Sequence, residues 1–325
     1  MSLPPIIDAL QCGKFDRDVF AMLQGGGFRC VTPTLGFWEG TMESLDSLAH
    51  WRDMAEENAD LIRIVKKADD IRACFADGKL GILLGYQNTN LLEDRIRYVE
   101  IFADLGVRVL QLTYNNQNEL GGSCYETADS GLTRFGREVV EEMGRCGIVV
   151  DCSHTGDRTT LDAILHSPKP IAITHANPAS IFPHARNRSD EVIKALAERG
   201  GVIGVAAYRN ITPDWACATA KGFAELIAKT VDIAGIDHVG VGTDFSYKSD
   251  DAYRAWMRMG RWSKKLNYGA GSSTHPGAVE KPEWLPTPDR LQDLIPALRE
   301  TGFSDAEVEK LMGGNWLRVY QSVFG

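Results

Sequence analysis

Eight short apolar segments recur along the chain, and most are followed by a stretch in which apolar residues have helical spacing. The apolar segments span residues 5–10, 28–34, 80–87, 107–115, 147–154, 170–176, 201–208 and 238–245. Most are nearly continuous in Val, Ile and Leu, which is typical of strands buried on both faces. Alternation of strands and helices predicts a parallel sheet, and eight such units predict closure into a barrel.

The predicted fold class is therefore α/β, a (β/α)8 barrel of the TIM type, formed by residues 1–325 as a single domain. An open doubly wound sheet is the main alternative, but no strand is followed by a GxGxxG or P-loop motif. Residues 246–284 break the alternation after the eighth strand and are rich in Gly, Ser, Lys and aromatic residues. This loop is expected over the active-site mouth, either as a lid that shapes the substrate site or as an ordinary surface excursion.

The net charge, the hydropathy and the cysteines indicate which cellular compartment and which classes of partner to expect. The chain has 35 Lys and Arg against 44 Asp and Glu, a formal net charge of −9, and no basic patch with interleaved aromatics. Nucleic acid is therefore not expected as a partner. No apolar stretch is long enough to cross a membrane, so no membrane partner is expected. Seven scattered cysteines without a CxxC pair favour reduced thiols in a cytoplasmic protein.

Ionisable residues collect where the predicted strands end, and barrel enzymes place catalysis there. His154 and His175 end the fifth and sixth strands, and Asp244 ends the eighth. Neighbouring strands lie about 4.8 Å apart, so both imidazoles can reach one metal ion. Asp244 would face them, placed to hold or deprotonate the attacking water. A lone histidine is more often a satisfied polar residue near a loop, but two at matching strand ends opposite an aspartate favour a site.

Arg186 follows the sixth strand and is a second kind of candidate. Its planar guanidinium suits bidentate binding of a carboxylate. A surface salt bridge is the other interpretation, and the residues alone do not separate the two.

These motifs together resemble the membrane (renal) dipeptidase family. They are Asp151-Cys-Ser-His154-Thr, Ile173-Thr-His175-Ala-Asn177, Ala185-Arg186-Asn187, Asp237-His-Val-Gly-Val-Gly-Thr-Asp244-Phe, Leu112-Thr-Tyr114-Asn-Asn, Phe303-Ser-Asp-Ala-Glu-Val-Glu and Asn315-Trp-Leu-Arg-Val. They cover nearly the whole chain in order. The family belongs to the amidohydrolase superfamily, and its members are zinc hydrolases of dipeptides, some with a D-residue at the C-terminus. The resemblance implies a metallopeptidase acting on a dipeptide or related small amide, and it suggests a homodimer.

The resemblance also implies a role for each matching position. His154 and His175 match the two histidines of the more buried metal. Arg186 matches the arginine that binds the substrate carboxylate, and Asp244 matches an aspartate near the metals. Tyr114 stands where the family has a substrate-contacting histidine. Asn177 is a further expected substrate contact.

Three positions depart from the family's pattern. The first strand of the family carries His-x-Asp, where this chain has Leu10 and Cys12, and its third strand supplies a bridging glutamate, where this chain has Gln87. Leucine cannot bind a metal, Cys12 could do so as a thiolate, and glutamine is a weak neutral ligand. Two zinc ions need carboxylates to offset four positive charges, so we expect no full binuclear site.

The resemblance therefore leaves one zinc ion, held by His154 and His175 with Gln87 as a weak ligand and Cys12 as a further candidate, or an empty site. Three functions stay open. The first is a metal-dependent dipeptide or amide hydrolase with Asp244 as the base. The others are a metal-free enzyme on the same scaffold and a non-catalytic binder of small amino-acid derivatives. The retained residues favour the first.

Overall fold

The computed structural model describes residues 4–261, 263–264 and 279–325. Its strands form two parallel sheets, with the orders β11-β1-β2-β4-β3 and β10-β9-β8-β7-β6-β5. The strands are β1 Ile6–Gly13, β2 Phe28–Pro33, β3 Ile62–Ile64, β4 Leu80–Ile82, β5 Gly85–Tyr86, β6 Val109–Gln111, β7 Val149–Asp151, β8 Ala172–Ala176, β9 Val202–Val205, β10 Val239–Val241 and β11 Phe245–Tyr247. Each of the eight predicted segments contains a strand, but the third, residues 80–87, is divided into β4 and β5, which lie in different sheets. β3 and β11 were not predicted as separate strands.

The two sheets are joined at two places, so the strands surround a common core as an α/β barrel. Thr34, directly after β2, forms a parallel bridge with Gly85 in β5. On the other side, the backbone N–H of Asp244 donates to the carbonyl of Leu10 in β1 over 3.1 Å. β11, which follows β10, also pairs with β1. The carboxyl ends of the strands therefore open at one mouth.

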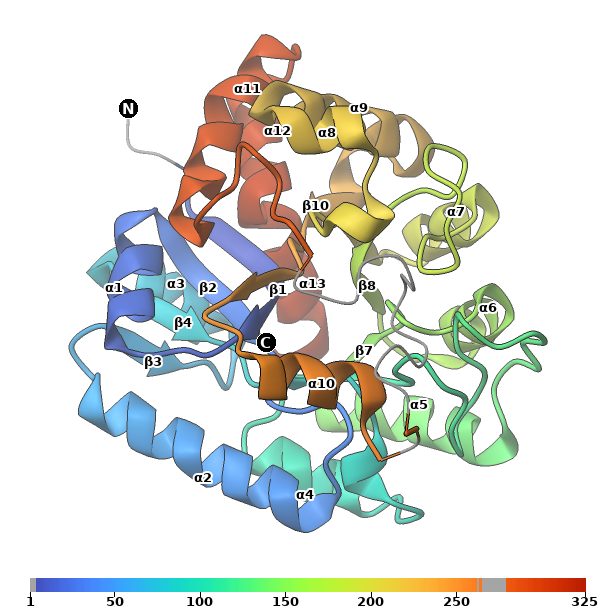
Figure 1. Cartoon of the computed structure of the whole chain (residues 1–325). Coiled ribbons are helices and arrows are strands. Elements are labelled where there is room, and N and C mark those ends of the chain that lie inside the picture. Colours follow the sequence, from blue (N-terminus) through green and yellow to red (C-terminus); the bar gives the residue numbers. More distant parts are fainter. Residues whose placement is uncertain (1–3, 262, 265–278) are drawn as a thin grey trace.

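Helices pack around the strands (Figure 1). They are α1 Arg17–Gly25, α2 Thr41–Glu57, α3 Ala68–Asp77, α4 Tyr98–Asp104, α5 Arg134–Cys146, α6 Asp157–His166, α7 Asp190–Glu198, α8 Asp214–Ala218, α9 Ala220–Ala234, α10 Asp251–Met259, α11 Leu294–Glu300, α12 Asp305–Glu309 and α13 Asn315–Phe324. Their ends follow local sequence: Ser189 caps α7 by accepting from the N–H of Val192, and α5 stops where Gly147 adopts φ +72°.

Two buried carboxylates tie neighbouring strands together just before the mouth. Asp8 in β1 accepts from the N–H of Thr243 at 2.8 Å and from its hydroxyl at 2.6 Å. Asp151 in β7 accepts from the N–H of Thr174 at 2.9 Å and from its hydroxyl at 2.7 Å. Burial raises the pKa of both carboxyl groups. Thr243 and Thr174 each precede a site residue, so these bonds fix the strand ends that carry the site.

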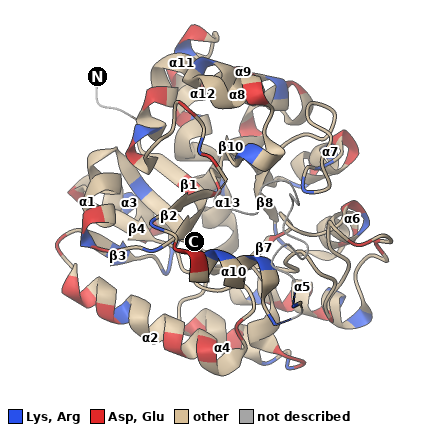
Figure 2. Cartoon of the chain, in the orientation of Figure 1, with Lys and Arg blue, Asp and Glu red and all other residues tan. Residues whose placement is uncertain are grey.

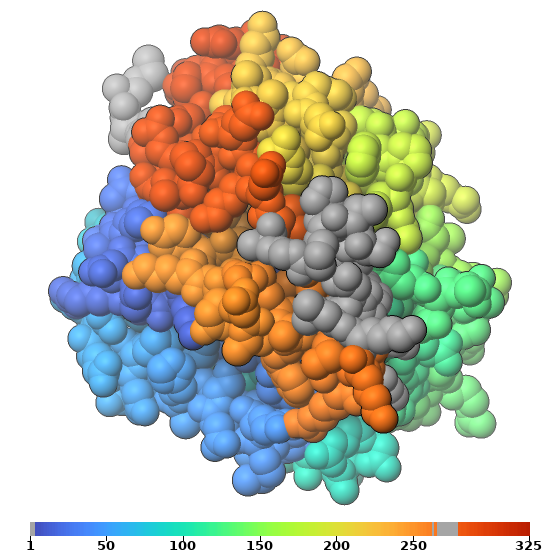
Figure 3. All heavy atoms as spheres, in the orientation of Figure 1, coloured from blue at the N-terminus to red at the C-terminus, as the bar shows by residue number. Residues whose placement is uncertain are grey.

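β11 and α10, which follow β10 in the chain, cross the mouth. Figure 3 shows the orange atoms of β11 and α10 spread over the middle of this face. Tyr253, Trp256 and Met257 of α10 pack against a buried cluster. That cluster comprises Leu10, Cys12, Phe37, Trp38 and Tyr114. Within the predicted lid segment, residues 262 and 265–278 lie outside the described part, and a lid function stays a prediction.

Charged side chains are distributed over the outer helices (Figure 2). None of the helices in the described ranges has the length and apolar content that a membrane span requires. That residues 1–325 form a single domain stays a prediction.

Candidate functional site

A cavity of about 280 Å³ opens at the mouth of the barrel. Six residues singled out from the sequence line it: Cys12, Gln87, Tyr114, His154, Arg186 and Asp244. Asn115, Tyr125 and Tyr208 also line it. The tertiary structure therefore gathers residues that are up to 232 positions apart in the chain.

The two histidines meet at the base of this cavity. His154 is 6% exposed and lines the cavity, and His175 is fully buried. Their Nε2 atoms lie 3.1 Å apart. Burial, and then the positive charge of Arg186, lowers the pKa of both imidazoles well below the usual value. Both rings are therefore neutral near pH 7, which is the state that binds metal ions.

The Nδ1 atoms of the two rings have partners that can accept a hydrogen bond. His154 Nδ1 lies 2.7 Å from Asn115 Oδ1, and His175 Nδ1 lies 2.8 Å from the hydroxyl oxygen of Thr174. Thr174 already donates its hydroxyl proton to Asp151, so it accepts from His175. With Nδ1 donating in both rings, both Nε2 lone pairs point toward one another. Metal-binding histidines in proteins also donate their second ring N–H to an acceptor, which leaves the opposite nitrogen free to bind the metal.

Asp244 lines the same cavity, and its backbone has a conformation that few residues other than glycine adopt. Its φ is +53°, and Asn115, also on the cavity, has φ +61°. Asp and Asn tolerate this left-handed region better than most residues, and such positions cluster at functional sites. Burial raises the pKa of Asp244 to about 6 despite the opposing charge of Arg186. The group is therefore an ionised carboxylate at neutral pH with a pKa suited to accept a proton.

The β1 side of the mouth is occupied by side chains bonded to one another. Gln87 donates through Nε2 to the Cys12 sulfur at 3.2 Å and to the Thr34 hydroxyl at 2.8 Å. The Cys12 thiol lies 3.6 Å from a carboxylate oxygen of Asp244, to which it donates. Burial, and then the charge of Asp244, raises the pKa of Cys12 well above its usual value. Cys12 is therefore a thiol in a hydrogen-bonded chain.

Tyr114 connects the two sides of the mouth. Its ring lies 4.4 Å from the ring of His154 and 4.9 Å from that of Phe37. The side chain is 4% exposed. It lines the cavity, where it can contact a bound molecule, and it shields His154 from water.

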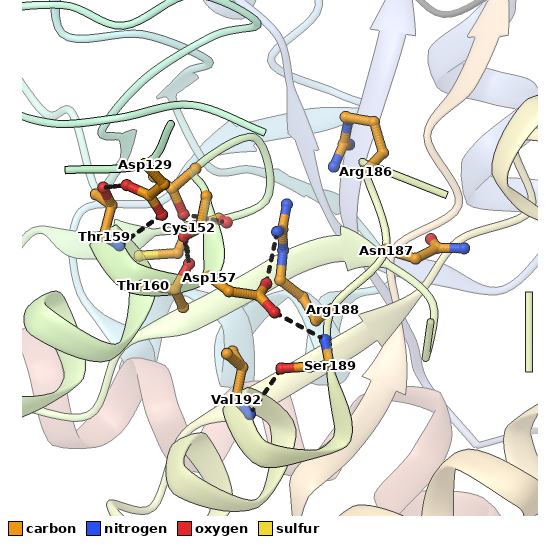
Figure 4. Close-up of polar contacts among 12 residues, drawn as sticks. Asp129, Cys152, Asp157, Thr159, Thr160, Arg186, Asn187, Arg188, Ser189 and Val192 are labelled. Atoms are coloured by element: carbon orange, nitrogen blue, oxygen red, sulfur yellow. Dashed lines mark hydrogen bonds and ion pairs between the residues drawn. The ribbon is translucent and has the colours of Figure 1, made fainter. Parts of the chain in front are cut away.

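Arg186 brings a buried positive charge to the cavity. It is 3% exposed, and it donates to the backbone carbonyls of Ser153 and His175. No described carboxylate forms an ion pair with it, whereas its neighbour Arg188 binds Asp157 at 3.0 Å (Figure 4). A buried charge of this kind is stabilised by an anionic ligand. The interpretation of Arg186 as part of a surface salt bridge is therefore wrong.

Asn177 was predicted to contact substrate, but the structure places it away from the cavity. Its side-chain nitrogen donates to the carbonyls of Ala206 and Ile211 and to the hydroxyl of Thr212. Its side-chain oxygen accepts from the N–H of Ala206 at 3.1 Å. The amide is fully used in joining β8 to the segment after β9, so the prediction is corrected: Asn177 supports the fold.

Sequence reasoning assigned no role to Asn115, Tyr125 or Tyr208. Asn115 and Tyr208 are the last residues of the predicted strands 107–115 and 201–208, and this position at a strand end is the sequence signal that could have identified them. Tyr208 accepts from the side chain of Asn210 at 2.9 Å, which leaves its own proton free to donate into the cavity. Tyr125 lies in the long connection before α5, where no strand marks it.

A zinc site is what the resemblance implies, and the donor atoms fit it in part. Two nitrogen ligands of one tetrahedral zinc lie about 3.4 Å apart, close to the separation of the two Nε2 atoms. The residues do not fit a second ion. Within the described ranges, no group of three or more His, Cys, Asp or Glu side chains has a metal-binding arrangement. Leu10 offers no ligand atom, and Cys12 and Gln87 are bonded to each other.

Fold and site together define an α/β barrel of the amidohydrolase type, with polar residues from several strand ends at one mouth. The family model of membrane dipeptidase (peptidase family M19) matches residues 27–252. The chain belongs to this family.

Curated relatives carry dipeptidase names. An uncharacterized dipeptidase of Schizosaccharomyces pombe is 29% identical over 86% of this chain and 62% of its own length. Dipeptidase tcpJ of Claviceps purpurea is 28% identical over 87% of this chain and 60% of its own length. This chain thus spans about three fifths of the length of these relatives.

Solved structures share the fold over the whole chain. An amidohydrolase from Pseudomonas aeruginosa has 35% identity and a TM-score of 0.93, covering 99% of this chain and 97% of that chain. A metallo peptidase from Rhodobacter sphaeroides, bound to a phosphinate mimic of the dipeptide L-Ala-D-Ala, has 19% identity and a TM-score of 0.81, covering 99% and 100%. At that identity the second likeness concerns the fold alone.

Proposed function

We propose that the chain is a metal-dependent hydrolase of the dipeptidase type, which cleaves a dipeptide or related small amide with one metal ion at His154 and His175. The observation that carries the proposal is the pair of Nε2 atoms 3.1 Å apart, with both Nδ1 atoms facing acceptors. Membership of the membrane dipeptidase family and the dipeptidase names of its relatives support it.

A zinc ion held by His154 and His175 would supply the electrophile that activates water and the scissile carbonyl. The remaining work falls to this chain's own residues. Asp244, with its pKa raised by burial to about 6, accepts the proton of the attacking water. Arg186 binds the substrate carboxylate and so holds the amide in the cavity. Tyr114 covers His154 and excludes solvent from it.

The number of metal ions follows from the charges available. A second zinc would add two positive charges on the β1 side, where Cys12 is a thiol and Gln87 a neutral amide. Asp244 alone cannot offset them. Gln87 and Cys12, which the sequence nominated as weak or candidate ligands, therefore take no part in the proposed metal site.

Metal analysis of the purified protein tests this proposal. We expect one equivalent of zinc in the wild-type protein and none in His154→Ala or His175→Ala, while Cys12→Ala, the matched control on the opposite side, keeps its zinc. Zinc-loaded protein should cleave dipeptides, and both histidine variants should not. Metal-free protein with full activity would instead support the metal-free enzyme. Metal-free protein that binds dipeptides without turnover would support the non-catalytic binder.

We further propose a reducing compartment, the cytoplasm, because all seven cysteines are free thiols. A homodimer stays a prediction from the family.

A further inference from the structure

The cavity has a charge opposite to that of the chain as a whole. The described residues that line it include six cations: Arg186, Arg209, Lys248, Arg254, Arg258 and Lys281. They include two carboxylates, Asp244 and Glu280, so the formal balance of this lining is six minus two, or four positive charges. The full chain has a net charge of −9. A cleft lined by one sign of charge concentrates ligands of the other sign.

The cations lie at two levels. Arg186 comes from the connection after β8 and is buried beside the histidine pair. Arg209 comes from the connection after β9, and the other four come from residues 248–258 and from Lys281. Basic positions on α10 are visible in Figure 2. These five cations form the outer group. A single substrate carboxylate bound by Arg186 would leave the outer group without an anionic ligand.

The outer group is only partly neutralised by the protein. Ion pairs join Lys248 to Asp16 at 2.6 Å, Arg209 to Glu280 at 3.6 Å, and Arg254 to Asp251. Asp251 is 99% exposed, so water screens that pair strongly. Arg258 is 4% exposed and has contacts of its own.

Lys281 is the outer cation without a carboxylate partner in the described part of the chain. Its ammonium lies 4.7 Å from the ring centre of Phe245 and 4.8 Å from that of Tyr247. Its hydrogen bond goes to the backbone carbonyl of Pro286, at 3.4 Å. The two rings hold the ammonium at the wall of the cavity without cancelling its charge.

We infer that the substrate is an amide with two carboxylates, one bound by Arg186 and the other by the outer cations around Lys281. The second carboxylate belongs either to an acidic side chain of a dipeptide or to a dicarboxylic acyl group on an amino acid. That the ligand is an amide that is hydrolysed rests on the proposed function. That the cavity binds two carboxylates rests on the charges of its lining residues alone.

Paired substrates test it with zinc-loaded protein. One pair is Ala-Glu against Ala-Gln, each with an L- or a D-residue in second place; the other is N-succinyl-alanine against N-butyryl-alanine. We expect kcat/KM to be about tenfold higher for the diacid in at least one pair, which also identifies the source of the second carboxylate. The Lys281→Met variant should reduce that ratio about fivefold. Lys221→Met, an exposed change on α9, should leave it unaltered. Ratios near one in both pairs would overturn the inference.

A binding measurement separates this inference from the proposed function. Calorimetric titration compares glutarate, a diacid, with butyrate, a monoacid of similar length. Glutarate should bind at least fivefold more tightly, and Lys281→Met should remove the difference. If no amide is hydrolysed, the proposed function fails while this titration still decides the inference; equal binding of the two acids overturns it.

Discussion

The two sides of the barrel mouth differ in what their side chains do. On the side of β7, β8 and β10, His154, Arg186 and Asp244 direct polar groups into the cavity. On the side of β1, β2 and β5, Cys12 and Gln87 bond to one another and to Thr34, next to the aromatic cluster that α10 covers. The same barrel thus keeps a reactive arrangement on one side and a satisfied network on the other.

A metal site therefore depends on free charges and lone pairs more than on its position in a fold. A carboxylate or an unpaired imidazole nitrogen in a cavity is stabilised by a cation. A thiol and an amide that satisfy one another gain nothing from one. Substitutions on either side of the mouth test this contrast, and the largest effect is expected at Asp244.

Asp244→Asn should lower kcat about 1,000-fold, because an amide cannot accept the proton of the attacking water. Asparagine tolerates the left-handed backbone at this position, so the fold should survive. Steady-state kinetics on a cleaved dipeptide measures the effect, with the exposed Asp18→Asn on α1 as the control. Activity within tenfold of wild type would remove Asp244 as the base.

Arg186→Met should lower kcat/KM about 100-fold, equivalent to about 3 kcal/mol, because the substrate carboxylate loses its buried partner. Arg186→Lys retains the charge but not the planar guanidinium, so its kcat/KM should lie between those of the wild type and Arg186→Met. The comparison uses Arg134→Met, an exposed change on α5. An equal loss with substrates that lack a carboxylate would mean that Arg186 only supports the fold.

Asn115→Gly should weaken zinc binding about tenfold or more, because His154 loses the acceptor that orients its ring. Glycine suits the φ of +61°, so backbone strain does not contribute. Asn115→Asp keeps an acceptor and should retain affinity. Competition with a chelator gives the affinities, and unchanged affinity in the glycine variant would show that Asn115 does not position His154.

The combined change Leu10→His, Cys12→Asp and Gln87→Glu should convert the satisfied side into a second metal site. We expect the zinc content to double, from one equivalent to two, because the new side chains add two carboxylates and an imidazole. Elemental analysis measures it. If the content stays at one equivalent in folded protein, the alignment of these three positions with metal ligands is wrong.

Much of this architecture could be predicted from local patterns. Buried strands have continuous apolar sequences, and residues at their carboxyl ends must gather at one mouth, so His154, His175 and Asp244 were found by position. The same reasoning failed for Asn177, which also follows a strand. Its amide turns toward backbone groups of the neighbouring β9 connection, and no local pattern reports which way a side chain turns.

The amino-acid sequence alone establishes the order of strands along the chain, the residue types at their ends, and the lack of a carboxylate at Cys12 and Gln87. The three-dimensional arrangement was needed to show that the two Nε2 atoms face one another, that Cys12 and Gln87 are hydrogen-bonded, and that Arg186 and Lys281 line one cavity. The reason is physical. The order of strands along the chain follows from local hydrophobic periodicity, whereas a free lone pair or an unmatched charge depends on partners from other strands, 21 positions away for His154 and His175 and 75 for Cys12 and Gln87.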